Sequence, residues 1–360
     1  MADQLKAMYN ETFLGEFAKK VESVYHSFDR KGFITAVLSE DWDQLALKAR
    51  MRRITESLGK FLPPSYKDAL SILFQIDEQC IGFPYLFFPD FVEVFGQKEE
   101  NWELSIKALE RFTKRSSSEF AVRPFITKQP ARMMEQMNHW ATDSDEHVRR
   151  LASEGCRPRL PWGGVLNQFT ADPAPILPIL NQLREDPSLY VRKSVANNLN
   201  DISKNHPELV LQIAQDWYGK SEHTNWIIKH ACRTLLKNGH REILSIFGYQ
   251  DAETIEVRSL RLENNLISIG EELAFSFDLH SEKTEKVRIE YAIDFMKANG
   301  QSRKKIFKVS ETTLTEKQTK SYSKKHAFKD LTTRKHYKGK HSISIIVNGA
   351  VKSSLDFLVD

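Results

Sequence analysis

Apolar residues recur at helical spacing through roughly the first two thirds of the chain. Between residues 11 and 27, Phe13, Phe17, Val21 and Val24 fall on one face of a helix. The same spacing returns over residues 40–62 and stops at two consecutive prolines, where a helix is expected to end. Because the alternation typical of strands is scarce here, the pattern predicts an all-helical domain over residues 1–250.

Three segments of this helical region resemble one another. They begin at His147, Tyr190 and Trp226, with the motifs HVRRLA, YVRKSVA and WIIKHA. Repeats of roughly 40 residues, each an antiparallel pair of helices, are typical of HEAT-like solenoids. The repeat therefore predicts that the helices stack into a HEAT-like α-helical solenoid.

The pattern changes to alternation after residue 250. Ile289, Tyr291 and Ile293 alternate with other residues as in a half-buried strand, and Asn348-Gly349 marks a tight hairpin. Short strands are predicted over 255–262, 266–280, 286–296, 304–310, 321–328, 341–347 and 350–359. We therefore expect a mainly α protein whose solenoid is followed, over residues 251–360, by an Ig-like β-sandwich whose strand topology the sequence does not determine.

The apolar stripes of the repeat helices leave a polar face that is mostly basic. We expect the following side chains to point outward: Arg149, Arg150, Ser153, Glu154 and Arg157 in the first helix, Arg192, Lys193, Asn197 and Asp201 in the second, and Lys229, His230, Arg233 and Lys237 in the third. A solenoid places equivalent helices side by side, so these residues are expected to form one wall. A solvated face would explain each helix alone, whereas three aligned basic faces favour a surface that binds a polyanion.

Two residues within the basic face allow both a structural and a functional interpretation. Glu154 lies four residues after Arg150 and three before Arg157, so it forms intrahelical ion pairs or presents a carboxylate to a ligand. Trp162 lies in a loop rich in proline and glycine, where it either stacks on a base or sugar or seals the core between repeats.

The net charge of +4 conceals an uneven distribution. Residues 301–340 hold 13 Lys and Arg against 3 Asp and Glu. We expect Lys304, Lys305, Lys324, Lys325 and the segment 334–340 to lie in loops at one end of the sandwich. Such loops either improve solubility or form a second clamp on the polyanion.

Several function classes are not supported by the sequence. The first residues lack the basic and apolar regions of a secretory signal, and no apolar run is long enough to span a membrane. Cys80, Cys156 and Cys232 form no Cys-x-x-Cys pair, and no metal-binding cluster, phosphate-binding glycine loop or nucleophile elbow is present. We expect a cytoplasmic protein without a membrane partner, metal or cofactor.

Four segments of the chain resemble the AlkC family of bacterial DNA alkylation-repair glycosylases, relatives of AlkD with HEAT-like repeats. They are SEFAVRPFI from Ser118, HVRRLASEGCRPRLPW from His147, VRKSVANNLNDISK from Val191, and the segment Trp226–Lys237. The resemblance covers nearly the whole chain, including the C-terminal β-domain that AlkD proteins lack.

The resemblance implies base excision repair on double-stranded DNA: hydrolysis of the N-glycosidic bond of bases alkylated at N3, such as 3-methyladenine and 3-methylcytosine. Glu154 is the first candidate for the catalytic carboxylate, with Glu119 and then Asp201 as possible second acids, and Trp162 would contact the lesion nucleotide. The DNA-binding residues would be Arg150, Arg157, Arg159, Arg192, Lys193, Asn197, Lys229, His230, Arg233, Lys335 and Lys338.

One alternative function remains open at this stage. A non-catalytic HEAT-repeat scaffold could use the same basic wall to bind nucleic acid or an acidic protein. The sequence does not separate the two methylated bases as substrates, and it shows no aromatic-rich pocket in the central helices. Because no apolar stripe is left over, we expect a monomer.

Overall fold

The computed structural model describes residues 5–39, 41–331 and 334–360. Its contacts divide the chain into two compact units. The first unit comprises residues 1–205 and 221–231, and the second comprises residues 206–220 and 232–360. Among the described residues, no helix has the length and apolar character needed to cross a membrane.

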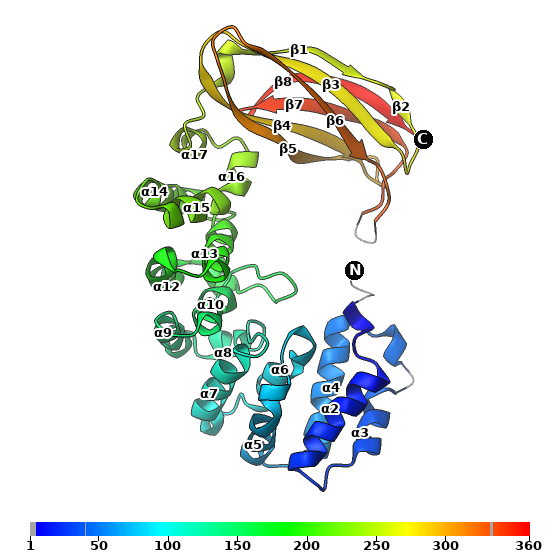
Figure 1. The fold of residues 1–360 in the computed structure, drawn as a ribbon, viewed down its shortest axis with the longest axis vertical. Coiled ribbons are helices and arrows are strands. Elements are labelled where there is room, and N and C mark those ends of the chain that lie inside the picture. The colour runs from blue at the N-terminus through cyan, green and yellow to red at the C-terminus, as the bar shows by residue number, and fades with distance from the viewer. Residues whose placement is uncertain (1–4, 40, 332–333) are drawn as a thin grey trace. The chain divides into compact units, whose positions relative to one another are not determined.

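The first unit is entirely helical (Figure 1). Its N-terminal half contains α2 (Glu11–Val24), α3 (Arg30–Val37), α4 (Leu47–Phe61), α5 (Tyr66–Ile76), α6 (Phe87–Phe95) and α7 (Trp102–Thr113). Asn10 caps the first of these helices by accepting a hydrogen bond from the backbone N–H of Phe13 at 3.0 Å. Phe17, Phe33 and Phe87 fill the interior of this half with tilted and edge-to-face ring contacts.

The repeats follow as stacked helices in the second half of this unit (Figure 1). These are α8 (Arg123–Lys128), α9 (Pro130–Trp140), α10 (Glu146–Gly155), α11 (Asn167–Ala171), α12 (Leu177–Gln182), α13 (Leu189–Ile202) and α15 (Glu222–Ala231). Helix α13 packs between α10 and α15. The apolar stripes predicted from the sequence are buried in this stack, for example Leu151 in α10, Val195 in α13 and Ile227 in α15.

Several predicted helix limits and faces were wrong. The pattern over residues 40–62 is a short 3-10 turn, Trp42–Gln44, followed by α4, and Glu40 lies outside the described residues. The helix expected over 226–237 is interrupted at Cys232.

Four side chains expected on the outward face are buried: Ser153, Glu154, Arg157 and Asp201. Helix α10 ends at Gly155 and packs directly against α13. The four side chains are buried because they lie where the C-terminal parts of these two helices are in contact.

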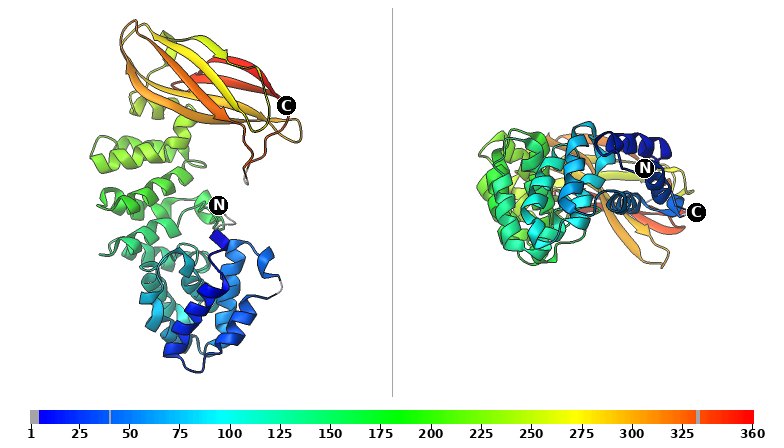
Figure 2. Two further views of the ribbon diagram at one scale, coloured as in Figure 1. Left: turned by 45° about the vertical axis from the view of Figure 1, so that its right-hand side comes forward. Right: turned by 90° about the horizontal axis from the view of Figure 1, so that it is seen from below.

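The second unit combines three helices with a β-sandwich (Figure 2). The helices are α14 (Pro207–Trp217), α16 (Arg233–Lys237) and α17 (Arg241–Ile246). The strands are β1 (Ile255–Leu262), β2 (Leu266–Ile267), β3 (Glu272–Ser281), β4 (Glu285–Met296), β5 (Ser302–Leu314), β6 (Thr319–Ala327), β7 (Gly339–Val347) and β8 (Ala350–Val359). One sheet has the order β1-β3-β6 and the other β2-β8-β7-β4-β5.

The sandwich encloses a core of side chains from both sheets, such as Phe275, Phe277, Ile293 and Ile345. The predicted Asn348-Gly349 hairpin is present, and both residues have the positive φ angles, 45° and 81°, that this turn requires.

Two predictions about the sandwich were wrong. The strand expected over 266–280 is split into β2 and β3, because β2 belongs to one sheet and β3 to the other. The chain crosses between the two sheets near Gly270, where φ is 107°. Lys304 and Lys305 lie in β5 and Lys324 and Lys325 in β6, not in loops. Each of these strands is the edge of its sheet, where lysines also prevent pairing with another edge.

Candidate active site

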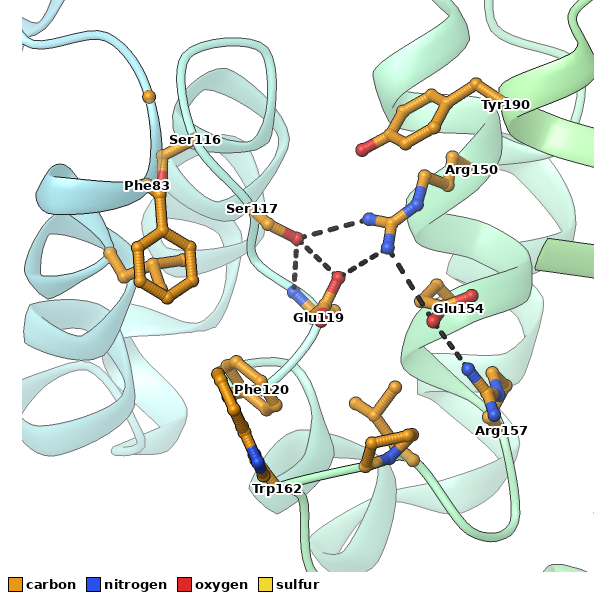
Figure 3. Close-up of a pocket in the computed structure, with 14 residues that line it drawn as sticks. Phe83, Ser116, Ser117, Glu119, Phe120, Arg150, Glu154, Arg157, Trp162 and Tyr190 are labelled. Atoms are coloured by element: carbon orange, nitrogen blue, oxygen red, sulfur yellow. Dashed lines mark hydrogen bonds and ion pairs between the residues drawn. The ribbon is translucent and has the colours of Figure 1, made fainter. Parts of the chain in front are cut away.

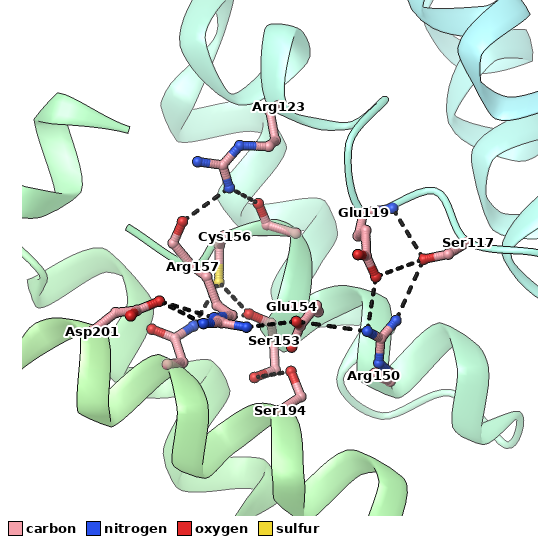
Figure 4. A network of polar contacts seen from close by, with 12 residues as sticks. Ser117, Glu119, Arg123, Arg150, Ser153, Glu154, Cys156, Arg157, Ser194 and Asp201 are labelled. Atoms are coloured by element: carbon pink, nitrogen blue, oxygen red, sulfur yellow. Dashed lines mark hydrogen bonds and ion pairs between the residues drawn. The ribbon is translucent and has the colours of Figure 1, made fainter. Parts of the chain in front are cut away.

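Five charged side chains form a chain of alternating sign within the first unit (Figure 4). Arg150 Nη2 lies 2.8 Å from Glu119 Oε2 and 3.6 Å from Glu154 Oε1. Arg157 Nη1 lies 2.7 Å from the same Glu154 oxygen, and Arg157 also bonds Asp201 Oδ2 through Nε at 2.9 Å. Glu154 is therefore held between two guanidinium groups, each of which is paired with a second carboxylate.

The carboxylates keep both arginines charged in spite of their burial. Burial alone would lower the pKa of Arg150, but Glu119 and Glu154 outweigh it and raise that pKa above its ordinary value. Burial opposes the charge of Arg157 in the same way, and Glu154 and Asp201 again raise its pKa. Glu154 Oε1 thus lies between two positively charged guanidinium groups.

The geometry leaves one oxygen of Glu154 available. Both ion pairs of Glu154 use Oε1, and no contact within the described ranges occupies Oε2. The residue as a whole is 6% exposed, so this oxygen lies in a confined position and not on an open surface. A carboxylate with one fixed oxygen and one free oxygen is suited to contact a ligand without losing its orientation.

Contacts between α10 and α13 fix the position of Glu154. Ser194 Oγ donates to Ser153 Oγ at 3.0 Å, and Asn198 Nδ2 donates to the carbonyl oxygen of Ser153 at 2.8 Å. Gly155 allows Val122 to pack closely against the end of α10, since a Cβ atom at residue 155 would lie only 2.6 Å from Val122 Cγ2. The last turn of α10 is therefore held on both sides, and Glu154 with it.

A pocket of about 450 Å³ opens over these charges (Figure 3). Glu119, Arg150, Glu154 and Arg157 line it together with four aromatic residues, which are Phe83, Phe120, Trp162 and Tyr190. Its volume is that of a site for a small ligand or a single nucleotide unit. The pocket therefore combines a fixed carboxylate with apolar ring surfaces.

Trp162 lies at the rim of this pocket and is 57% exposed, which excludes the interpretation that it seals the core. Its φ angle of 63° is uncommon for a residue other than glycine, and such angles persist only where the surrounding structure enforces them. The side chain is therefore presented to solvent by a loop of defined geometry.

Some lining residues were not identified from the sequence. Ser117 Oγ donates to Glu119 Oε2 at 2.8 Å, and the Tyr190 ring lies 4.6 Å from the Arg150 guanidinium carbon. Phe83 and Phe120 line the pocket although neither belongs to a repeat helix. The sequence did point to Tyr190 in one respect, because it is the first residue of the second repeat motif.

The other predicted residues lie outside this charge chain. Arg159 Nη2 donates to Asn205 Oδ1 at 3.0 Å, and Arg192 Nη1 donates to the carbonyl oxygens of Asp186 and Pro187. Lys193 is exposed, as are Lys229, Lys335 and Lys338, whereas Asn197 and Arg233 are half-buried and His230 stacks on Trp226. Arg233, Lys335 and Lys338 belong to the second unit.

No group of three or more His, Cys, Asp or Glu side chains within the described residues has an arrangement that could hold a metal ion. The three cysteines are buried free thiols, and burial raises the pKa of each, to about 11 for Cys80 and to about 12 for Cys156 and Cys232. These thiols are therefore protonated at neutral pH, and their low thiolate content does not suit nucleophilic chemistry.

Comparison with known proteins assigns the family. A solved structure of the alkylpurine DNA glycosylase AlkC from Pseudomonas fluorescens, bound to DNA with an abasic site analogue, is 38% identical. The match has a TM-score of 0.95 and covers 99% of each chain. The chain belongs to the AlkC family. The uncharacterized protein YhaZ of Bacillus subtilis (strain 168) is 53% identical over 359 residues, a match that covers 100% of each chain.

Two family models agree with this AlkC-family assignment. The model described as DNA alkylation repair enzyme matches residues 95–235, which include α10, α13 and the pocket lining except Gly82, Phe83 and Leu86. The model described as the C-terminal Ig-like domain of the uncharacterised protein YhaZ matches residues 256–360. The predicted fold class, a helical solenoid followed by an Ig-like domain, is confirmed.

Proposed function

We propose that this AlkC-family protein is a DNA glycosylase that removes cationic N3-alkylated bases, such as 3-methyladenine and 3-methylcytosine, from double-stranded DNA. The observation that carries the proposal is Glu154, which lines the pocket and whose carboxylate is fixed through one oxygen, Oε1, by the half-buried Arg150 and the buried Arg157. The similarity to the AlkC alkylpurine glycosylase, which was solved with DNA, supports DNA as the substrate.

The chemistry requires a carboxylate but little acid catalysis. A base alkylated at N3 carries a positive charge, so it takes the electron pair of the C1′–N bond and leaves as a neutral molecule without prior protonation. The sugar develops oxocarbenium character, which a nearby carboxylate stabilises electrostatically. Water then adds to C1′ and releases a proton, for which the free oxygen of Glu154 is the acceptor in this proposal.

The neighbouring residues have supporting roles in the proposed mechanism. Arg150 and Arg157 orient Glu154 through its Oε1 atom. Glu119, at the pocket wall, is the preferred second carboxylate. Asp201 is a weaker candidate because it already pairs with Arg157 and with Lys204 Nζ at 2.9 Å, and Trp162 would stack on the lesion nucleotide.

The remaining predicted DNA-binding residues, all basic except Asn197, are proposed to hold the phosphates of the duplex. In the helical domain over 1–250 these are Arg159, Arg192, Lys193, Asn197, Lys229, His230 and Arg233. In the β-domain over 251–360 they are Lys335 and Lys338, as part of a second clamp. Contacts of this kind release counterions, so they make binding sensitive to salt. We propose that the protein acts as a cytoplasmic monomer without a cofactor.

A base-release assay tests the proposed activity directly. Duplexes with one 3-methylcytosine or 3-methyladenine are incubated with the protein, and the free base and the alkali-labile abasic site are quantified. The proposal expects release of at least one of the two bases and none from an unmodified duplex. Binding without release of either base would instead indicate the non-catalytic scaffold.

A further inference from the structure

The loop that carries Trp162 is held from behind by a buried arginine. We call residues 156–166 the Trp162 loop. Arg123 Nη1 donates to the carbonyl oxygens of Gly155 and Arg157, both at 2.9 Å, and its Nη2 donates to the carbonyl oxygen of Gly164. Arg123 is 6% exposed. These bonds fix the two ends of the loop but do not reach its tip.

The tip of the loop is held by a residue from the N-terminal half of the chain. Lys48, in the first turn of α4, donates from Nζ to the carbonyl oxygen of Trp162 at 3.0 Å. The same ammonium group lies 4.4 Å from the centroid of the Phe120 ring, which lines the pocket. Lys48 therefore connects the loop tip to the pocket wall across 114 residues of sequence.

Behind the loop there is space into which the tip could move. A second cavity of about 400 Å³ is lined by Lys48, Phe120, Arg123 and residues 163–166 of the loop. The buried Leu160, 4% exposed, anchors the loop two residues before its tip, whereas Trp162 itself is 57% exposed. Within the tip itself, Gly163 N–H donates to the carbonyl oxygen of Leu160 at 3.0 Å, which closes a local turn without linking it to another element.

We propose that Lys48 is a positioning residue for Trp162: its ammonium group holds the loop tip so that the indole stays at the pocket rim. The expected effect of Lys48 on excision rests on the proposed glycosylase function. Its expected effect on the position of Trp162 does not. Holding the indole in advance lowers the entropy lost when the lesion nucleotide is bound. The N-terminal half then contributes to the site through Lys48 as well as through Phe83, which lines the pocket.

The structural consequence is tested by acrylamide quenching of tryptophan fluorescence. The chain holds 6 tryptophans, so the Trp162 signal is obtained as the difference from Trp162→Phe. Lys48→Met retains the aliphatic stem and removes the hydrogen bond, and it is expected to increase quenching of Trp162. Lys60→Met, which changes an exposed lysine near the other end of α4, is the matched control and should leave quenching unchanged.

The catalytic consequence is tested by single-turnover excision. Lys48→Met is expected to slow excision roughly tenfold, as for the loss of one hydrogen bond to a charged group, and Lys48→Arg should restore most of the rate. In a Trp162→Ala background the same substitution should have no further effect, since Lys48 acts through Trp162.

Two results would overturn the inference. One is unchanged quenching of Trp162 in Lys48→Met. The other is an effect of Lys48→Met that persists in the Trp162→Ala background, which would mean that Lys48 contacts DNA directly. If the unaltered protein releases no base, the proposed function fails, and quenching alone then decides whether Lys48 positions the loop.

Discussion

Two sets of charged residues, one from each unit of this protein, differ in burial and pairing. In the first unit Glu154, Arg157 and Asp201 are each at most 6% exposed, and every one of them is paired. In the second unit Lys335 and Lys338 are exposed and lie in the segment between β6 and β7. Buried paired charges have fixed positions, whereas exposed lysines remain mobile and solvated.

The difference separates two tasks that a DNA glycosylase must perform. A reacting carboxylate must be held within a fraction of an ångström, which requires burial and several bonds. A phosphate contact requires only a positive charge at the surface, and its strength depends on salt. Substitutions in the buried charge chain should therefore affect rate and stability, and those in the exposed lysines should affect binding.

The largest effect is expected for Glu154→Gln. The amide retains the shape and can still accept a hydrogen bond from Arg157, but it does not stabilise a developing positive charge. We expect single-turnover excision to fall by roughly 100-fold or more, while affinity for an abasic duplex stays within about threefold. Glu146→Gln, an exposed residue at the start of α10, is the control. Full activity of Glu154→Gln would remove Glu154 from the mechanism.

Removal of one buried charge should then reduce stability. Arg157→Met leaves Glu154 and Asp201 without their shared partner, so we expect the free energy of unfolding to fall by about 3 kcal/mol. Urea denaturation measures this change. Arg159→Met is the matched control two residues away, where the side chain is only half-buried and bonds Asn205, and it should cost less than about 1 kcal/mol. An equal loss of unfolding free energy in both variants would contradict the proposed difference between buried paired charges and more exposed ones.

The exposed lysines are expected to contribute to binding alone. Lys335→Ser/Lys338→Ser should weaken binding to an abasic duplex severalfold and reduce the slope of log Kd against log salt by up to about 2. The control Lys283→Ser/Lys317→Ser removes the same charge from the turns at the opposite end of β6. If both pairs change the slope equally, the lysines between β6 and β7 have no specific role.

The last prediction concerns a buried histidine of the β-domain. Burial, followed by the charges of Arg334, His336 and Lys305, lowers the pKa of His326 from 6.5 to about 4. The unfolded chain therefore binds this proton at a higher pH than the folded chain. Stability conferred by the neutral ring is complete above pH 6.5 and is lost as the pH falls toward 4.

We expect the free energy of unfolding to decrease by at most about 1.4 kcal/mol per pH unit over this range. Thermal unfolding between pH 7 and pH 4.5 measures the decrease. His326→Gln, which can still bond the Tyr291 hydroxyl, should flatten the profile relative to the unaltered protein. A parallel profile in the variant would show that other groups cause the acid sensitivity.

The candidate site could be predicted in part from the sequence. The correct and the incorrect predictions differ in whether the feature depends on residues close together in the chain. Glu154, Arg150 and Arg157 lie within one turn or two of each other in sequence, so their ion pairs follow from helical spacing. Their burial did not follow from spacing, because it depends on the contact between α10 and α13. The four aromatic residues of the pocket come from four separate segments, so no local pattern indicated a ring-lined pocket.

The β-domain shows the same division. Alternation and the Asn348-Gly349 turn predicted its strands, because both signals are local. The assignment of strands to sheets required long-range pairing, which split residues 266–280 and placed the lysine pairs on edge strands.

By itself, the sequence determined the helical repeats, the change to strands near residue 250 and the motif around Glu154, since each depends on residues a few positions apart. Only the tertiary structure decided which charges are buried, which oxygen of Glu154 is left without a partner, and which residue holds the loop of Trp162. The last of these is a bond between residues 48 and 162. Such contacts depend on how distant elements pack, and periodicity along the chain carries no record of them.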